Sequence, residues 1–330
     1  MRALLMTGPS QGPDRTEVDE IAAPRPGAGE VTIDVSYAGV NFMDVMARRG
    51  DPGYAVTWPY VPGLEVAGTV REVGRDVTGL AVGQRVAAFT RGGGLAEVAL
   101  ADAALVVRLP DAVPLPDAAA APLMLSTAIL LLTDVARFQP GESILMHSAS
   151  GGVGSAIAQL VPLLGGGLRI GTVGRANKVA DARGNGWDVA LLRDDALAEA
   201  VRAATPGGVD VILDPSGTSL LEFDLTIAAP GGRIALFGNA SGDQPAPLPS
   251  LGQLIGGNVA LAGFSMSRLT AIAPTRAVGA LRRVMKLLSD GQLHAGVTEI
   301  RPLDEVRDLH QLLAEGRGTG KYVAALARQK

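Results

Sequence analysis

Hydrophobic and polar residues alternate along several short stretches of the first 122 residues. Val31, Ile33 and Val35 alternate with Thr32 and Asp34, so an extended strand here would have one apolar and one polar face. Glycines and prolines recur between such stretches, where they favour turns. Strands are predicted at residues 31–37, 66–73, 85–89 and 97–100. The pattern therefore predicts an all-β, barrel-like module over residues 1–122.

Short apolar runs alternate with segments of helical periodicity from residue 123 to residue 265. The predicted elements are strands at 144–146, 168–173, 187–192, 209–213, 233–237 and 258–263, and helices at 153–164, 178–183, 196–204 and 221–228. Apolar strands that alternate with amphipathic helices are typical of a parallel sheet covered on both faces. Ligands bind such sheets at the carboxyl ends of the strands, so we expect a binding site there.

Residues 266–330 have the pattern of two helices followed by a strand. The predicted elements are helices at 278–288 and 303–316 and a strand at 322–326. Two helices and a strand are too few for an independent core. We therefore expect this segment to pack on residues 1–122 and to make that domain discontinuous.

The composition is that of a globular protein with room for two cores. The chain has 330 residues, of which 47% are hydrophobic and 19% are charged, and its net charge is −4. Acidic and basic residues are interspersed, so a nucleic-acid partner is not expected. The most apolar region, residues 123–132, is interrupted by Ser126 and Thr127 and is too short to span a bilayer. The N-terminal apolar segment is too short for a signal peptide, so we expect a cytoplasmic protein without a membrane partner.

Cysteine and histidine usage limits the chemistry. The chain has no cysteine, which excludes disulfides and thiol catalysis. Its three histidines, His147, His294 and His310, are far apart in the sequence and lack the spacing of metal ligands. We therefore expect no metal site.

A glycine-rich turn separates the predicted strand at 144–146 from the helix that follows it. Gly151, Gly152 and Gly154 would let the backbone approach a pyrophosphate closely, and free N–H groups at the helix start would face its negative charge. Strand, tight turn and helix in this order make a dinucleotide phosphate site. In a chain with 43 glycines, an ordinary strand-to-helix turn is the alternative.

Two cations follow the next predicted strand. An NAD site needs an acidic residue about 20 positions after the glycines to bind the ribose 2′-hydroxyl. No carboxylate lies between Gly154 and Asp181, whereas Arg175 and Lys178 stand where a 2′-phosphate would bind. A solvated helix start is the alternative, but cations there oppose the helix dipole. The sequence therefore predicts NADPH rather than NADH as the cofactor.

Three polar residues of the first segment are candidates for a site. Asn41 and Asp44 follow a predicted strand and begin a short helix that ends near Gly50, so they could cap that helix or contribute to a site. Glu65 lies among apolar residues at the start of a predicted strand. For Glu65, internal pairing that stabilises the barrel is the favoured interpretation.

Three segments occur with an order and spacing that are specific. Residues 39–44 read Gly-Val-Asn-Phe-Met-Asp, residues 61–68 read Val-Pro-Gly-Leu-Glu-Val-Ala-Gly, and residues 148–154 read Ser-Ala-Ser-Gly-Gly-Val-Gly. They look like the active-site segment, the glycine-glutamate strand and the phosphate loop of one family. Over essentially its whole length the chain resembles the zinc-independent quinone oxidoreductases of the medium-chain dehydrogenase/reductase superfamily.

The resemblance implies two domains and a set of cofactor contacts. Residues 1–122 would form a GroES-like β-barrel catalytic domain, residues 123–265 a Rossmann NADPH-binding domain with a doubly wound parallel sheet, and residues 266–330 a segment returning to the catalytic domain. The implied cofactor residues are Asn41, Thr127, Ser150, Gly151, Gly152 and Val153; Gly174, Arg175 and Lys178 at the 2′-phosphate; Phe237, Gly238, Asn239, Phe264 and Ser265 at the nicotinamide half; and Arg317. Family members are commonly homodimers that pair the edge strands of their Rossmann sheets, here residues 258–263.

The resemblance also implies a reaction. NADPH would supply hydride to the electrophilic carbon of a small carbonyl compound, either a quinone or an α,β-unsaturated carbonyl compound (enone). The catalytic candidates are Asn41, Tyr54 and Asp44. Asn41 could hydrogen-bond the substrate carbonyl or the nicotinamide ribose. Tyr54, which follows an Asp-Pro-Gly turn at 51–53, is a candidate proton donor, and solvent is the alternative donor.

The chain departs from its relatives at several positions. Zinc alcohol dehydrogenases of the superfamily have Cys and His ligands near the positions of Asn41 and Glu65, and this chain has neither there. Met46 stands where close relatives often have tyrosine, and Ile129 and Leu130 stand where they often have aromatic residues. We therefore expect a more aliphatic pocket.

Three other functions share parts of this pattern. An enoyl-thioester reductase acting on acyl-CoA or acyl carriers would have the same fold and cofactor. A non-catalytic NADPH-binding protein would bind NADPH without oxidising it. A methyltransferase also has a glycine-rich first loop, but it needs an acidic ribose partner where Arg175 stands.

Overall fold

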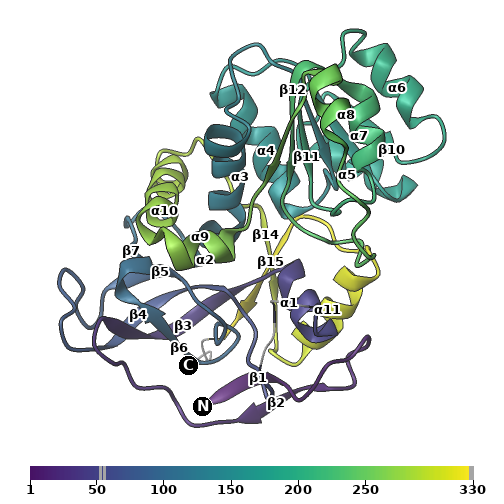
Figure 1. Cartoon of the computed structure of the whole chain (residues 1–330). Helices are drawn as coiled ribbons and strands as arrows, with labels where there is room; N and C mark the ends of the chain where they lie inside the picture. The colour runs from purple at the N-terminus through teal and green to yellow at the C-terminus, as the bar shows by residue number, and fades with distance from the viewer. Residues whose placement is uncertain (52–53, 55–56, 327–330) are drawn as a thin grey trace. The chain divides into compact units, whose positions relative to one another are not determined.

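The computed structural model describes residues 1–51, 54 and 57–326. The chain forms two compact units, of which the first contains Met1–Ser126 and Met266–Lys330 and the second contains Thr127–Ser265. The sequence predicts the first boundary at residue 122, whereas the structure places it at Ser126. Figure 1 shows the elements of both units.

The first unit is built on a seven-stranded sheet with the path β14-β15-β3-β4-β5-β7, and β6 also pairs with β3. The strands are β3 (Glu30–Val40), β4 (Glu65–Val73), β5 (Arg85–Phe89), β6 (Val98–Asp102), β7 (Val106–Arg108), β14 (Val297–Ile300) and β15 (Lys321–Ala325). All four strands predicted for residues 1–122 are confirmed. Because β15 pairs antiparallel with β3, the C-terminal segment completes this sheet.

Other elements surround this sheet. They are a two-stranded ribbon of β1 (Arg2–Met6) and β2 (Thr16–Glu20), and the helices α1 (Phe42–Arg49), α2 (Leu115–Ala120), α9 (Met266–Ile272), α10 (Pro274–Ser289) and α11 (Glu305–Ala314). Val306 and Leu309 of α11 lie in one hydrophobic cluster with Ile33 and Val70 of the sheet. This cluster forms the core of the first unit.

One helical run is longer than the sequence predicts. Helices α2 and α3 (Ser126–Leu130) and two short π-helical segments form a continuous apolar run over Leu115–Val135. Its mean hydropathy is 1.7. By length and composition this run could cross a membrane, and 83% of its most apolar window is buried inside the protein. The limit of 123–132 predicted for the apolar region was therefore wrong, because alanines before it extend the helix. Such burial is typical of a core helix.

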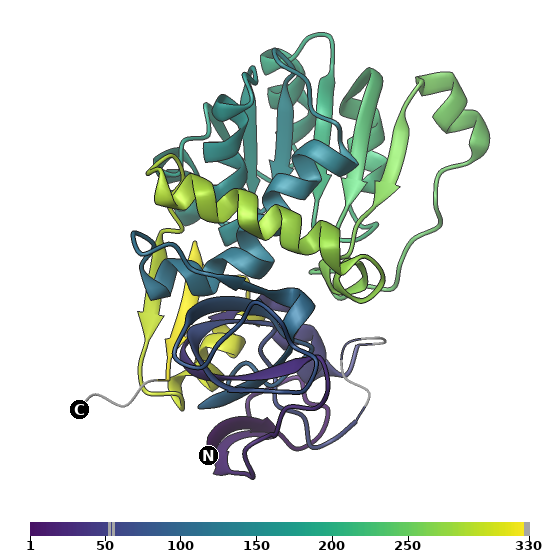
Figure 2. The same ribbon diagram turned by 90° about the vertical axis from the view of Figure 1, so that its left-hand side faces the viewer.

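The second unit is a parallel sheet with the strand order β10-β9-β8-β11-β12-β13. Its elements are β8 (Ile144–His147), α4 (Gly152–Leu163), β9 (Arg169–Val173), α5 (Val179–Gly184), β10 (Val189–Leu192), α6 (Leu197–Ala204), β11 (Val209–Asp214), α7 (Leu221–Ile227), β12 (Ala228–Leu236), α8 (Leu251–Gly257) and β13 (Ala260–Gly263). Helices lie on both faces of the sheet (Figures 1 and 2). The predicted doubly wound α/β fold is confirmed, and the strand order reverses beside β8, where such sheets bind ligands.

Candidate active and cofactor-binding site

The glycine-rich turn joins β8 to α4 as the sequence predicts. Ser148 has a positive φ of 60° directly after β8, and α4 begins at Gly152. A Cβ on Gly154 would lie 2.5 Å from the carbonyl oxygen of Ala149, so only glycine allows the helix to approach the turn this closely. The first N–H groups of α4 are therefore held at the end of the central strand, where an anion can bind.

The last residue of β8 is held by a buried polar network. His147 Nδ1 lies 2.6 Å from Thr172 Oγ1 of β9, and His147 Nε2 lies 2.8 Å from Asp224 Oδ1 of α7. All three side chains are inaccessible to solvent. Burial raises the pKa of Asp224, and the His147 hydrogen bond opposes that shift. The network fastens β9 and α7 to the strand that carries the glycine turn.

Most of the predicted cofactor residues of this unit follow strands whose carboxyl ends share one edge of the sheet. These residues are Ser150, Gly151, Gly152 and Val153 after β8, Gly174, Arg175 and Lys178 after β9, Phe237, Gly238 and Asn239 after β12, and Phe264 and Ser265 after β13. A Cβ on Gly238 would lie 2.7 Å from the carbonyl oxygen of Pro215, so the loops after β11 and β12 are in close contact. Thr127 is buried in α3, and Asn41 and Arg317 belong to the first unit.

Three cations gather where β9 and β10 end. Arg175 and Lys178 flank a short 3₁₀ turn after β9, and Arg193 follows β10 directly. Burial lowers the pKa of the Lys178 ammonium, and the charges of Arg175 and Arg193 lower it further. Sequence reasoning found the first two cations and missed Arg193. Its position just after the predicted strand at 187–192 was the available signal.

A buried ion pair lies at the centre of the polar site of the first unit. Lys321 Nζ donates hydrogen bonds to Glu65 Oε1 at 2.5 Å, to Asn41 Oδ1 at 2.6 Å and to the carbonyl of Val40 at 3.0 Å. Glu65 Oε2 accepts a hydrogen bond of 2.6 Å from the backbone N–H of Leu123. The predicted internal pairing of Glu65 is confirmed. Sequence reasoning missed Lys321, which is 256 positions away along the chain.

These two charged residues fix the side chain of Asn41. Its Nδ2 donates to Glu65 Oε1 at 2.9 Å and to the carbonyl of Gly39 at 3.3 Å. The ammonium of Lys321 can only donate, which identifies the amide atom facing it as oxygen. Both hydrogens of the amide are therefore engaged, and Oδ1 accepts the hydrogen bond from Lys321.

Asp44 is fully buried and binds backbone groups. Its Oδ2 accepts a hydrogen bond of 2.8 Å from the N–H of Asn41, and its Oδ1 accepts one of 3.0 Å from the N–H of Gly63. Burial raises its pKa to about 6, and both backbone hydrogen bonds oppose that shift. Asp44 therefore caps α1 and fastens the segment before β4, which is the capping alternative that the sequence left open.

Tyr54 is half-buried, and its amide N–H donates to the carbonyl of Asp51 at 3.1 Å. Burial raises the pKa of its phenol, and the charge of Asp51 adds to that shift. Proton release from this phenol is therefore harder than from an ordinary tyrosine. The predicted turn at 51–53 falls partly outside the described residues.

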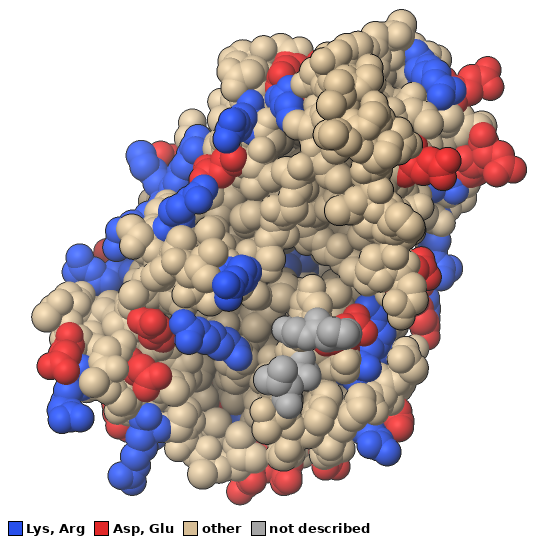
Figure 3. Space-filling model, in the orientation of Figure 1, with Lys and Arg blue, Asp and Glu red and all other residues tan. Residues whose placement is uncertain are grey.

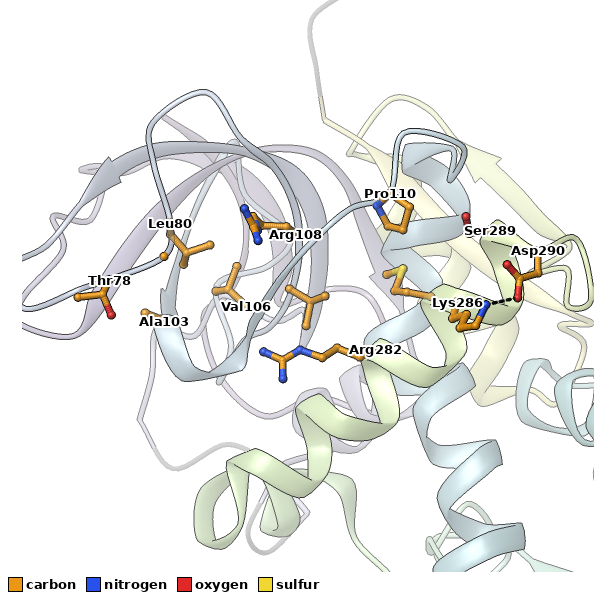
Figure 4. Close-up of a pocket in the computed structure, with 13 residues that line it drawn as sticks. Thr78, Leu80, Ala103, Val106, Arg108, Pro110, Arg282, Lys286, Ser289 and Asp290 are labelled. Atoms are coloured by element: carbon orange, nitrogen blue, oxygen red, sulfur yellow. Dashed lines mark hydrogen bonds and ion pairs between the residues drawn. The ribbon is translucent and has the colours of Figure 1, made fainter.

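A cavity of about 650 Å³ in the first unit lies beside α10 and β7. Figure 4 shows Arg108 and Arg282 at this cavity, and the ion pair of Lys286 with Asp290 at 2.7 Å. Among the described residues that line it there is no predicted catalytic or cofactor residue. On the face in Figure 3, positive and negative residues are interspersed.

Comparison with known proteins assigns the chain to a family. Residues 27–111 match the alcohol dehydrogenase GroES-like domain, and residues 152–285 match the zinc-binding dehydrogenase domain. Quinone oxidoreductase-like protein 2 of Mus musculus is 31% identical over 307 residues, which cover 92% of this chain and 87% of the relative. The chain belongs to the zinc-independent quinone oxidoreductases. This family is part of the medium-chain dehydrogenase/reductase superfamily, and the chain is accordingly an oxidoreductase.

Two further family resemblances cover nearly the whole chain. The synaptic vesicle membrane protein VAT-1 homolog of Danio rerio is 29% identical over 98% of this chain and 69% of the relative. The crystal structure of Escherichia coli quinone oxidoreductase complexed with NADPH has a TM-score of 0.90 and 26% identity, and the match covers 98% of this chain and 100% of that chain. These matches confirm the GroES-like and Rossmann folds of the two units.

The chain has no cysteine. Within residues 1–51, 54 and 57–326, no group of three or more His, Cys, Asp or Glu residues could hold a metal ion. Asn41 and Glu65, which the resemblance places near the zinc-ligand positions of zinc alcohol dehydrogenases, are joined by a hydrogen bond of 2.9 Å from Asn41 Nδ2 to Glu65 Oε1.

Proposed function

We propose that the protein is an NADPH-dependent, zinc-independent oxidoreductase that transfers hydride to a quinone or an α,β-unsaturated carbonyl compound. The observation that carries the cofactor assignment is the cationic site after β9, where Arg175 and the buried Lys178 replace the acidic residue of an NAD site. The Escherichia coli quinone oxidoreductase structure, which has this fold, is a complex with NADPH. The substrate class comes from the family's quinone oxidoreductases.

The described residues fit this cofactor. Gly154 lets α4 approach the turn, so the first N–H groups of the helix face the pyrophosphate. Arg175 can bind the 2′-phosphate through two parallel hydrogen bonds, and Lys178 adds a point charge. Phe237 and Phe264, at the ends of β12 and β13, would line the nicotinamide half. NADPH, when bound, supplies the hydride, and a proton from Tyr54 or solvent completes the reduction of the carbonyl compound.

Asn41 suits contact with a hydroxyl group better than contact with a carbonyl. Its two amide hydrogens point at Glu65 and the carbonyl of Gly39, so neither is left to donate to a substrate carbonyl. An amide oxygen can accept two hydrogen bonds, and a ribose hydroxyl can donate one. The hydrogen bonds of the Asn41 amide support our proposal that it contacts the nicotinamide ribose, one of the two roles that the sequence leaves open. Lys321 and Glu65 are positioning residues in this proposal.

The assay that tests this function follows NADPH and NADH oxidation with quinones, enones and enoyl thioesters. We expect turnover with small quinones or enones and a higher kcat/KM with NADPH than with NADH, because only NADPH offers a group that Arg175 and Lys178 can bind. Turnover confined to enoyl thioesters would instead identify the acyl-carrier reductase. Tight NADPH binding without oxidation by any acceptor would identify the non-catalytic alternative and overturn the proposal.

We also propose that the protein is a homodimer whose interface includes β13. This strand is the edge of the six-stranded sheet, and no strand in the described part of the chain pairs with its outer side, so another strand can pair there. The preceding helix α8 exposes Leu251 by 73% and Ile255 by 65%, and Leu248 just before it is 66% exposed. An exposed apolar cluster beside an open sheet edge favours a second copy of the chain related by a two-fold axis.

A further inference from the structure

Arg193 lies directly beside the residues that follow β9. Strands β10 and β9 are parallel neighbours at one edge of the sheet, with Leu192 opposite Val173. The backbone N–H of Arg193 donates to the carbonyl of Val173 at 2.9 Å, which continues the ladder by one residue. Arg193 is therefore placed next to Gly174 and Arg175 by the sheet itself, not by a loop.

The guanidinium of Arg193 lies over Gly174. A Cβ built on Gly174 would be 2.8 Å from Arg193 Nη2, so any other residue here would displace the guanidinium. Gly174 does not have the left-handed φ that favours glycine, and the three nearest contacts of such a Cβ are all atoms of the Arg193 guanidinium. The guanidinium of Arg193, which follows β10, thus lies at the end of β9.

The guanidinium has no compensating anion in contact with it. It is half-buried, and among the residues that the structure describes it has neither a hydrogen-bond nor an ion-pair partner. Burial lowers its pKa, and Asp214 at the end of β11 raises it. Strands β8 and β9 separate β11 from β10, and Asp214 Oδ1 already accepts a hydrogen bond of 2.6 Å from the N–H of Ser216. The other oxygen, Asp214 Oδ2, is buried and has no hydrogen-bond partner among the described residues, so the charge of Asp214 acts on Arg193 without a hydrogen bond between them.

Arg175, Lys178 and Arg193 bring three positive charges to the neighbouring ends of β9 and β10. The charges of Arg175 and Arg193 both act on Lys178, and Asp181 is the carboxylate that opposes them there. A half-buried guanidinium such as that of Arg193 is costly without a counter-charge, and a phosphate dianion bound beside it would supply one. We propose that Arg193 is a third ligand of the cofactor's 2′-phosphate and a determinant of the preference for NADPH over NADH. This inference rests on the proposed NADPH site.

The test compares binding of NADPH and NADH to the full chain by fluorescence titration. Arg193→Gln should weaken NADPH binding by about 10- to 100-fold, because a hydrogen-bonded charge pair with phosphate is lost, and leave NADH binding nearly unchanged. Arg193→Lys should fall between, because an ammonium keeps the charge without the planar fork. The salt dependence of NADPH binding should also be shallower in Arg193→Gln than in the natural chain.

Two further variants separate the outcomes. Arg202→Gln removes an exposed arginine of α6 in the same unit and should leave the affinities for both cofactors unchanged. Arg175→Gln tests the proposed site independently of Arg193. If the natural chain binds NADPH and NADH equally, the NADPH assignment fails, and this inference with it.

If Arg175→Gln loses the preference and Arg193→Gln retains it, the cofactor site stands and the role of Arg193 is overturned. If Arg193→Gln weakens the binding of NADPH and of NADH equally, the guanidinium contacts a part that the two cofactors share. That result also overturns the proposal. Melting temperatures of all variants show whether each is folded. The Arg193→Lys result decides the question should Arg193→Gln fail to fold.

Discussion

His310 of α11 is fully buried, and within the described part of the chain neither of its ring nitrogens has a hydrogen-bond partner. Its Nε2 lies 3.9 Å from Asp44 Oδ2, and Arg48 of α1 is the nearby cation that acts on it. Burial lowers the pKa of His310 to about 3, and the charge of Arg48 lowers it too. Because burial raises the pKa of Asp44 to about 6, both residues are less charged at mildly acidic pH than free side chains would be.

These shifts have opposite effects on stability. An unfolded histidine binds a proton below about pH 6.5, whereas folded His310 does so only near pH 3, so its contribution destabilises the fold as pH falls through this window. Folded Asp44 binds a proton near pH 6 and an unfolded aspartate near pH 4, so its contribution stabilises the fold as pH falls. The two slopes oppose each other between about pH 6 and pH 4.

Replacing His310 should remove its contribution to the pH dependence of stability and leave that of Asp44. The quantity to compare is the unfolding free energy of His310→Leu minus that of the natural chain. We expect this difference to rise by about 2 kcal/mol as pH falls from about 6.5 to 5, because residue 310 takes up a proton on unfolding only in the natural chain. Urea denaturation at several pH values measures the difference. Leu312→Met, which exchanges one non-titrating residue of α11 for another, is the control and should differ from the natural chain by the same amount at every pH. Parallel profiles for His310→Leu and the natural chain would contradict the shift.

At the scale of elements, the sequence predicts helices and strands with a local pattern and misses those that depend on pairing with distant residues. The β8–turn–α4 unit is readable from sequence because its glycines and its change of period are neighbours along the chain. Strand β14 was missed, because two of its four residues are exposed and its pairing with β15 stabilises it. The same applies to α8, whose residues are mostly exposed and have no apolar stripe against the core.

The start of α4 makes a prediction about Gly154. Gly154→Ala should lower the unfolding free energy by about 1–3 kcal/mol, because the added methyl group would lie 2.5 Å from a backbone oxygen that cannot rotate away. Chemical denaturation measures this change. The matched control is Gly184→Ala in α5, where a Cβ has no neighbour within 4 Å and helix propensity favours alanine by up to about 1 kcal/mol. Equal effects at both positions would show that close approach is not what requires Gly154.

For the whole molecule, the two units and the proposed dimer depend on contacts between distant residues, which the periodicity of the sequence does not predict. Residues 266–330 join the first unit because β15 pairs with β3, which gives the sheet a strand from the far end of the chain. The open edge at β13 follows from the sheet order alone. A β-strand that ends a sheet pairs readily with a copy of itself when apolar residues surround it.

The dimer can be tested by analytical ultracentrifugation. We expect the natural chain to sediment at twice its chain mass, and Leu251→Glu combined with Ile255→Glu to sediment as a monomer, because buried carboxylates would oppose association. Ile272→Glu, at an isoleucine of α9 that is 61% exposed, is the control and should remain dimeric. A monomeric natural chain would overturn the proposed interface. So would a double variant that remains dimeric.

The sequence alone determined the alternation of strands and helices, the glycine turn and the two cations that follow the next strand. Each is a local pattern, set by residues that are neighbours along the chain and therefore visible in their spacing. Only the tertiary structure decided the partners of distant residues. It placed Lys321 against Glu65 and Asn41, Arg193 over Gly174, and His310 near Asp44. The reason is physical: strand pairing and helix packing bring these side chains together, and no periodicity along the chain records which strands pair.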